Sequence, residues 1–143
     1  MGLNYNVWLP KLKFTLQTIA ITYPAIPNDV SKKKYYDLIQ NVPIFFPLEP
    51  IGKNFLTLLD KYPVTPYLSS RMSFMKWINF IFNKINLQLN KPEENFYDSL
   101  EKYYEEYKPK EFRNRELIKT RKKYIQIGSA LLIIFSIMYF YKK

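Results

Sequence analysis

The sequence predicts an all-α protein, a bundle of helices followed by a single C-terminal helix that crosses a membrane. Apolar residues recur every three or four positions along most of the chain, which is the helical period. A content of 3 glycines and 10 prolines favours helices separated by stiff turns. Residues 124–141 carry no charge, and 18 helical residues reach about 27 Å, close to the hydrocarbon thickness of a bilayer.

The first predicted helix covers about Val7 to Thr22, and Pro10 fits its first turn. Its apolar positions at helical spacing are Leu12, Leu16 and Ile19. Pro24 and Pro27 end this helix, because proline disfavours a helical conformation at the residue before it.

The second helix is expected from a cap at Asn28 or Asp29 to about Gln40. Its predicted buried face consists of Tyr35, Leu38 and Ile39. Prolines at positions 43, 47 and 50 predict a rigid turn region, and a short third helix should follow over about 50–61.

A long fourth helix is predicted over about 71–90, with Ser69 or Ser70 as its cap. Its apolar residues form one stripe at the helical period, namely Phe74, Trp77, Ile78, Ile81, Ile85 and Leu89. Pro92 stops it, and a fifth helix rich in Tyr and Glu is expected over about 94–107.

A basic run precedes the charge-free stretch, and it consists of Arg113, Arg115, Lys119, Arg121, Lys122 and Lys123. Tyrosines at 124, 139 and 141 stand at the ends of the stretch, as in an interfacial belt. A core helix would show a polar face, which residues 130–138 lack. We therefore predict a helical domain over 1–108, a basic linker over 109–123 and a transmembrane helix over 124–141.

Composition narrows the function further. The net charge of +10 favours anionic partners, and the basic run beside an apolar stretch favours lipid head groups over nucleic acid, so no nucleic-acid partner is expected. The chain has no cysteine and no histidine, which argues against a metal site and against Ser-His-Asp or Cys-His catalysis.

Five patches follow one another between Trp8 and Tyr104. They are Trp8 with Leu16, Ala20 and Tyr23-Pro24; Pro47-Leu48-Glu49-Pro50-Ile51 with Asn54-Phe55; Ser70-Arg71 with Phe74 and Trp77; Asn83 with Ile85-Asn86; and Lys91-Pro92. In this order and spacing they resemble the Erv/ALR sulfhydryl oxidases. The resemblance implies a four-helix bundle with a short fifth helix.

Members of that family pass electrons from a Cys-x-x-Cys pair to FAD. Leu48 and Ile51 stand at the two cysteine positions, and Gln17, Asn54 and Phe82 stand where the family has histidine. Because a thiolate must attack in thiol oxidation, this chain alone cannot carry out the reaction. The resemblance therefore implies a pseudoenzyme with no catalytic residue.

The resemblance also implies a vestigial FAD site in the mouth of the bundle, formed by Trp77, Asn83, Asn86 and Lys91. We expect this site to be unoccupied, because the lost histidines leave FAD with too few contacts. Trp77 alternatively belongs to the core, and the two asparagines are alternatively solvated or capping residues.

The resulting functional hypothesis is a non-catalytic accessory subunit of a membrane complex in the mitochondrial inner membrane, in respiratory-chain or ATP-synthase assembly. Its expected partners are other subunits, and lipids through 124–141 and the basic run. The alternatives are a FAD-retaining redox protein that uses partner thiols, and a tail-anchored viral envelope or virion-assembly protein. The outer membrane is a further location, the basic run favours the matrix or cytosolic side for the domain, and a homodimer stays open.

Overall fold

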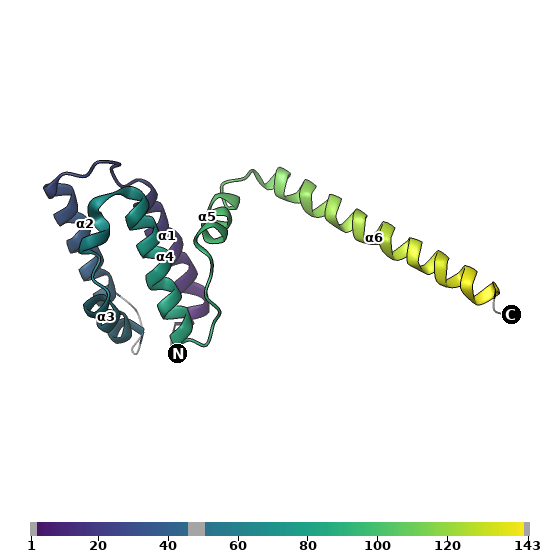
Figure 1. Cartoon of the computed structure of the whole chain (residues 1–143), viewed down its shortest axis with the longest axis horizontal. Coiled ribbons are helices and arrows are strands. Elements are labelled where there is room, and N and C mark those ends of the chain that lie inside the picture. Colours follow the sequence, from purple (N-terminus) through teal and green to yellow (C-terminus); the bar gives the residue numbers. More distant parts are fainter. Residues whose placement is uncertain (1–2, 46–50, 142–143) are drawn as a thin grey trace. The chain divides into compact units, whose positions relative to one another are not determined.

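Every regular element is helical in the computed structural model, which describes residues 3–45 and 51–141 (Figure 1). The helices are α1 (Tyr5–Ile21), α2 (Asp29–Asn41), α3 (Ile51–Lys61), α4 (Arg71–Gln88), α5 (Phe96–Glu105) and α6 (Lys110–Tyr141), with 3-10 turns η1 (Val42–Phe45) and η2 (Thr65–Ser69). The chain divides into two compact units, Met1–Tyr103 and Tyr104–Lys143.

The core of the first unit is built around α4, which packs against α1 and α3 (Figure 1). The predicted apolar stripe of α4 is confirmed, since Phe74, Trp77, Ile78, Ile81 and Ile85 are all buried and Leu89 packs against them half-buried. Residues from the neighbouring helices complete this core, among them Leu16 and Ala20 of α1 and Phe55 and Leu59 of α3.

Polar caps fix where the helices begin. The Asn28 side chain accepts a hydrogen bond from the Ser31 amide at 2.8 Å, and the Ser70 side chain accepts one from the Ser73 amide at 3.2 Å, so both predicted caps are confirmed. The predicted start of α1 was two residues late, because Asn4 caps it. Pro10 consequently lies inside the helix rather than in its first turn.

Two further expectations need correction. Leu38 is 40% exposed, so the buried face of α2 is narrower than predicted and centres on Ile39, which is fully buried. Helix α5 begins at Phe96 rather than near Glu94, because Asn95 caps it and its side-chain oxygen accepts a hydrogen bond from the Tyr97 amide at 2.8 Å. The prolines at 47 and 50, together with Leu48, lie outside the described residues.

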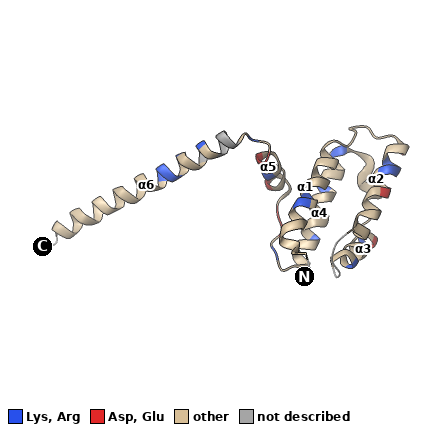
Figure 2. Ribbon diagram, turned by 180° about the vertical axis from the view of Figure 1, so that it is seen from behind, with Lys and Arg blue, Asp and Glu red and all other residues tan. Residues whose placement is uncertain are grey.

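The second unit consists largely of α6, a continuous helix of 32 residues. The segment predicted as a basic linker is helical from Lys110 onward and joins the apolar segment without a break. Residues 117–141 are long and apolar enough to cross a membrane, and none of that span is buried. Figure 2 shows Lys and Arg in the first part of α6 and neutral residues along the rest of its described length.

Candidate functional site

The residues predicted for a flavin site lie on α4 and on the chain just after it, and they have different surroundings. Trp77 is 1% exposed, and its indole N–H donates to the Tyr62 carbonyl oxygen at 3.2 Å. Its ring packs against Phe74 within the core, with centroids 6.5 Å apart. Trp77 therefore serves as a core residue whose single polar group is already bonded.

Asn83 of α4 holds the connection between α4 and α5 by hydrogen bonds. Its amide nitrogen donates to the Glu94 carbonyl oxygen at 2.9 Å, and its amide oxygen accepts from the Glu94 N–H at 3.0 Å. Asn79, one turn earlier on the same face, donates to the same carbonyl at 3.1 Å. The carboxamide of Asn83 thus has both polar ends engaged by backbone.

The Glu94 side chain forms ion pairs with two more helices. Its carboxylate pairs with Lys13 of α1 at 2.6 Å and with Lys102 of α5 at 2.5 Å. Burial raises the pKa of this carboxyl, but the hydrogen bonds and charges of the two lysines outweigh burial and lower the pKa to about 2. We call Asn79, Asn83, Glu94, Lys13 and Lys102 the Glu94 hub.

Asn86 and Lys91 lie apart from the hub's bonds and line an open hollow of about 400 Å³. Its other lining residues are Pro92, Glu93, Glu94, Asn95, Asp98 and Lys102. The Lys91 amine donates to the Asn6 side-chain oxygen at 2.6 Å and lies 5.1 Å from the centre of the Tyr5 ring. The hollow is polar and carries both signs of charge.

The three positions where the resemblance places histidine also have roles within the protein. Gln17 donates to the hydroxyl of buried Ser99 at 3.0 Å, which links α1 to α5. Phe82 is 1% exposed and belongs to the core, and Asn54 is half-buried on α3. At the second cysteine position Ile51 is 6% exposed and opens α3, whereas Leu48 lies outside the described residues.

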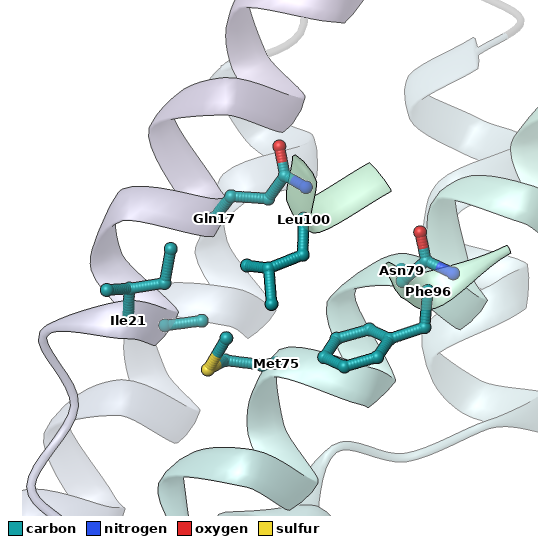
Figure 3. Close-up of a pocket in the computed structure, with 7 residues that line it drawn as sticks. Gln17, Ile21, Met75, Asn79, Phe96 and Leu100 are labelled. Carbon is teal, nitrogen blue, oxygen red and sulfur yellow. The ribbon is translucent and has the colours of Figure 1, made fainter. Parts of the chain in front are cut away.

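A small cavity lies between α1, α4 and α5 (Figure 3). Its volume is about 10 Å³, and Gln17, Ala20, Ile21, Met75, Asn79, Phe96 and Leu100 line it. The Asn79 side-chain oxygen is buried, and it has no hydrogen-bond partner among the residues that the structure describes. The cavity has room for about one water molecule, which could donate to that oxygen, and is far too small for a flavin ring.

Other residues of the resembling patches tie the end of α1 to the start of α4. Arg71 donates through Nε to the Tyr23 carbonyl oxygen, and the Tyr23 hydroxyl donates to the Leu68 carbonyl at 2.8 Å. The Tyr23 ring meets Phe74 edge-on, with centroids 5.2 Å apart. These contacts show that two of the patches pack against each other in the folded bundle.

Comparison with known families shows to which family the chain belongs. The Erv1/Alr family matches residues 13–120, well over half of the chain. The chain belongs to the Erv1/Alr family. A curated relative, "Probable FAD-linked sulfhydryl oxidase R368" of Acanthamoeba polyphaga mimivirus, is 32% identical over 74 residues, which are 51% of this chain and 52% of the relative. The match thus spans about half the length of that relative.

Solved structures confirm the predicted fold. The yeast Erv1 core has a TM-score of 0.64 at 20% identity, covering 72% of this chain and 86% of its own. The FAD-binding domain of Erv1 from Saccharomyces cerevisiae has the same TM-score and identity, covering 71% of this chain and 95% of its own. This Erv1/Alr protein therefore has an Erv1-like helical fold, with an added apolar helix able to span a membrane.

The described residues of this Erv1/Alr chain fit FAD only in part. Asn86 and Lys91 line an open hollow and could contact a ligand there. Trp77 is buried with its N–H bonded, and both polar groups of Asn83 are engaged by Glu94. Any FAD would have to bind without these two groups or displace their present contacts.

Proposed function

We propose that this chain is a non-catalytic, membrane-anchored Erv1/Alr protein that serves as a structural subunit of a membrane complex. One observation carries the proposal: an oxidase fold without a single cysteine. Thiol oxidation needs a thiolate, and the described cysteine position holds the buried, apolar Ile51. The fold can still pack as a helical bundle and offer its surface to another subunit.

The polar groups of the bundle support this proposal, because they stabilise the fold. The Glu94 hub connects α1, α4 and α5, and its bonds use groups that a ligand would otherwise need. The 3-10 turn η1 presents Ile44 and Phe45, 68% and 80% exposed, and exposed apolar side chains suit contact with another subunit. Helix α6 supplies the anchor.

Two locations follow from relatives, and each is a proposal for this chain. The family as a whole suggests the mitochondrial inner membrane, where the subunit would join respiratory-chain or ATP-synthase assembly. The mimivirus relative suggests a viral membrane, where the protein would be tail-anchored. Imaging of the full chain with an N-terminal fluorescent tag in its own cells distinguishes mitochondria from viral assembly sites.

Isolation of the native protein in mild detergent tests the subunit role. We expect the full chain to co-migrate with a larger membrane assembly, whose members mass spectrometry identifies. A Phe45→Asp chain should keep its helix content and lose that co-migration, whereas Tyr97→Asp, an exposed aromatic on α5, should retain it. Migration of the unaltered chain as a small free species would contradict the proposal.

A second candidate is a FAD-retaining redox protein that takes its thiols from a partner. It is favoured by the hollow beside Asn86 and Lys91, by the FAD-linked relative and by the FAD-binding domain among the structural matches. When bound, FAD would supply a two-electron acceptor for a partner dithiol. Flavin absorbance in the purified full chain, and FAD released on denaturation, would support this candidate, and a colourless protein would exclude it.

Restoring the missing dithiol separates the two candidates further. In a Leu48→Cys/Ile51→Cys double variant we expect no flavin and no dithiol-driven oxygen consumption, because the scaffold lacks its electron acceptor. The single variant Leu48→Cys is the control for unspecific thiol effects. Oxygen consumption by the double variant alone, together with bound flavin, would favour the second candidate.

A further inference from the structure

We propose that α6 selects anionic phospholipid, with its basic segment in the head-group layer and residues 1–103 on that same side of the membrane. The basic segment is defined here as Arg115, Lys119, Arg121, Lys122 and Lys123. The inference rests on the proposed membrane anchoring and adds the lipid class and the orientation.

The basic segment concentrates positive charge in a short, exposed part of α6. All five side chains are exposed, and they fall within nine consecutive residues of α6. The ion pairs that the structure describes lie elsewhere in the chain. Residues 115–123 contain one acidic residue, Glu116, whose side chain is outside the description, so five basic residues and one acidic residue leave a net charge of +4. Arg113 lies on the same helix, although its side chain is outside the description.

The continuity of α6 determines how deep these charges can lie. The helix runs unbroken from the basic segment into 124–141, and the rise of about 1.5 Å per residue places Lys123 next to the apolar boundary at Tyr124. Lys and Arg are costly in hydrocarbon, whereas tyrosine favours the interface. Once 124–141 spans the bilayer, the basic segment has to lie among head groups.

The angular spread of the charges fits an upright helix. At about 100° per residue, Arg115, Lys119 and Lys122 share one face and Lys123 lies about 80° from Arg115, whereas Arg121 points about 100° or more away from the other four. A helix lying flat on the surface would instead gather its charges on one face and its apolar residues on the other. The charges therefore lie on more than one side of the helix, where surrounding head groups can contact them.

Charge complementarity favours anionic lipid as the partner. Phosphatidylserine and similar lipids give a leaflet net negative charge, and basic segments beside a span bind such leaflets. RNA would meet the same cations, but the apolar stretch begins directly after Lys123, and RNA does not complement an apolar surface. By the positive-inside rule the same charges keep the N-terminal unit on the cytosolic or matrix side.

The test uses the full chain reconstituted in vesicles of mixed phosphatidylcholine and phosphatidylserine, with spin-labelled phosphatidylserine or phosphatidylcholine as the probe. We expect the protein to associate with labelled phosphatidylserine about three-fold or more in preference to phosphatidylcholine. The preference should approach one in a Lys119→Gln/Arg121→Gln/Lys122→Gln/Lys123→Gln variant. It should also weaken in 1 M salt, where screening is strong.

A matched control removes the same charge elsewhere. Lys11, Lys33, Lys34 and Lys53 are exposed in the first unit, and replacing all four with Gln should leave the lipid preference unchanged. Protease added to the cytosolic or matrix face of sealed membranes should digest the N-terminal unit. Digestion from the opposite side only would overturn the orientation.

Alkaline carbonate extraction distinguishes the two failures. If carbonate releases the unaltered chain from membranes, the anchoring itself is wrong, and the proposed function fails with it. If the chain resists extraction but shows equal association with both labelled lipids, the anchoring stands and the lipid inference is overturned. Equal loss of preference in the Lys11/Lys33/Lys34/Lys53 control would also overturn it, because net charge alone would then explain the effect.

Discussion

Asn83 shows how one side chain can hold a connection between helices. Because it satisfies both the N–H and the carbonyl of Glu94, we expect Asn83→Ala to lower the free energy of unfolding by about 1–3 kcal/mol. Chemical denaturation of the full chain in mild detergent, followed by circular dichroism, measures this loss. Asn86→Ala is the matched control on the same helix, and it should change stability by less than about 0.5 kcal/mol.

Glu94 should make the stability of the fold depend on pH. Its pKa is about 2 in the folded chain against a reference of 4.5, so folding favours the ionised form. The stabilisation is complete above the reference value and is lost as the pH falls from about 4.5 toward 2. Because the carboxylate is partly exposed, we expect a loss of about 1–2 kcal/mol.

The Glu94→Gln variant isolates this contribution. Denaturation midpoints measured between pH 6 and pH 3 should fall less in Glu94→Gln than in the unaltered chain. Glu101→Gln, which alters an exposed glutamate on α5, should follow the unaltered chain. Parallel pH curves for the unaltered chain and Glu94→Gln would show that the two lysines do not hold this carboxylate ionised.

At the scale of single residues, the sequence identified some residues of the site but did not identify their hydrogen-bond partners. Asn83 was singled out through the family resemblance, but its partner is a backbone segment 11 residues later, which helical periodicity does not locate. Asn79 and Glu94 were missed. The available signal was Asn79 and Asn83, four residues apart among apolar residues in the middle of α4, since a buried polar side chain needs a partner.

The end of α4 depends on one left-handed residue. Asn90 has φ of 56°, its amide donates to the Leu87 carbonyl at 3.1 Å, and the Lys91 amide donates to the Asn86 carbonyl at 2.8 Å. This is the Schellman pattern, in which Gly and Asn are favoured. We expect Asn90→Val to destabilise the fold by about 1–2 kcal/mol and Asn90→Gly to leave it unchanged or more stable. Thermal unfolding of both variants checks the order, and equal midpoints would contradict the assignment.

A charged residue in the apolar part of α6 should weaken the insertion of this helix into the membrane. A Leu132→Lys change places an amine near the middle of the span, at a cost of about 2.5–3.5 kcal/mol on insertion scales. We expect a larger fraction of the variant to be released by alkaline carbonate. Ile44→Lys, at an exposed position of the first unit, should remain with the membrane as the unaltered chain does.

Elements were predictable where local chemistry decides them. Asn28 and Ser70 are polar caps, and the helices that follow them begin as expected. Helix α1 began earlier than predicted because Asn4 caps it, and α5 began later than predicted because Asn95 caps it. Both capping asparagines were signals available in the sequence.

The charge of the whole molecule is unevenly distributed. Residues 104–143 hold ten of the 22 basic residues but only four of the 12 acidic ones. The helical class, the apolar stripe of α4 and the added C-terminal helix were all predictable, because each depends on composition or periodicity over many residues. The arrangement of the Glu94 hub was not, because it depends on three helices meeting at one carboxylate.

The bond from the Glu94 amide to Asn83 also has a consequence for motion. Residues 91–95 are not helical, and amides in such connections ordinarily exchange with solvent deuterium within the fast phase of a labelling experiment. Here the Glu94 amide is bonded to α4 itself, so its exchange should wait for the opening of that helix. The hydrogen-exchange map of this protein should therefore show slow exchange at Glu94, as at Lys91 with its bond to the Asn86 carbonyl, within an otherwise fast segment, and α5 should open together with α4.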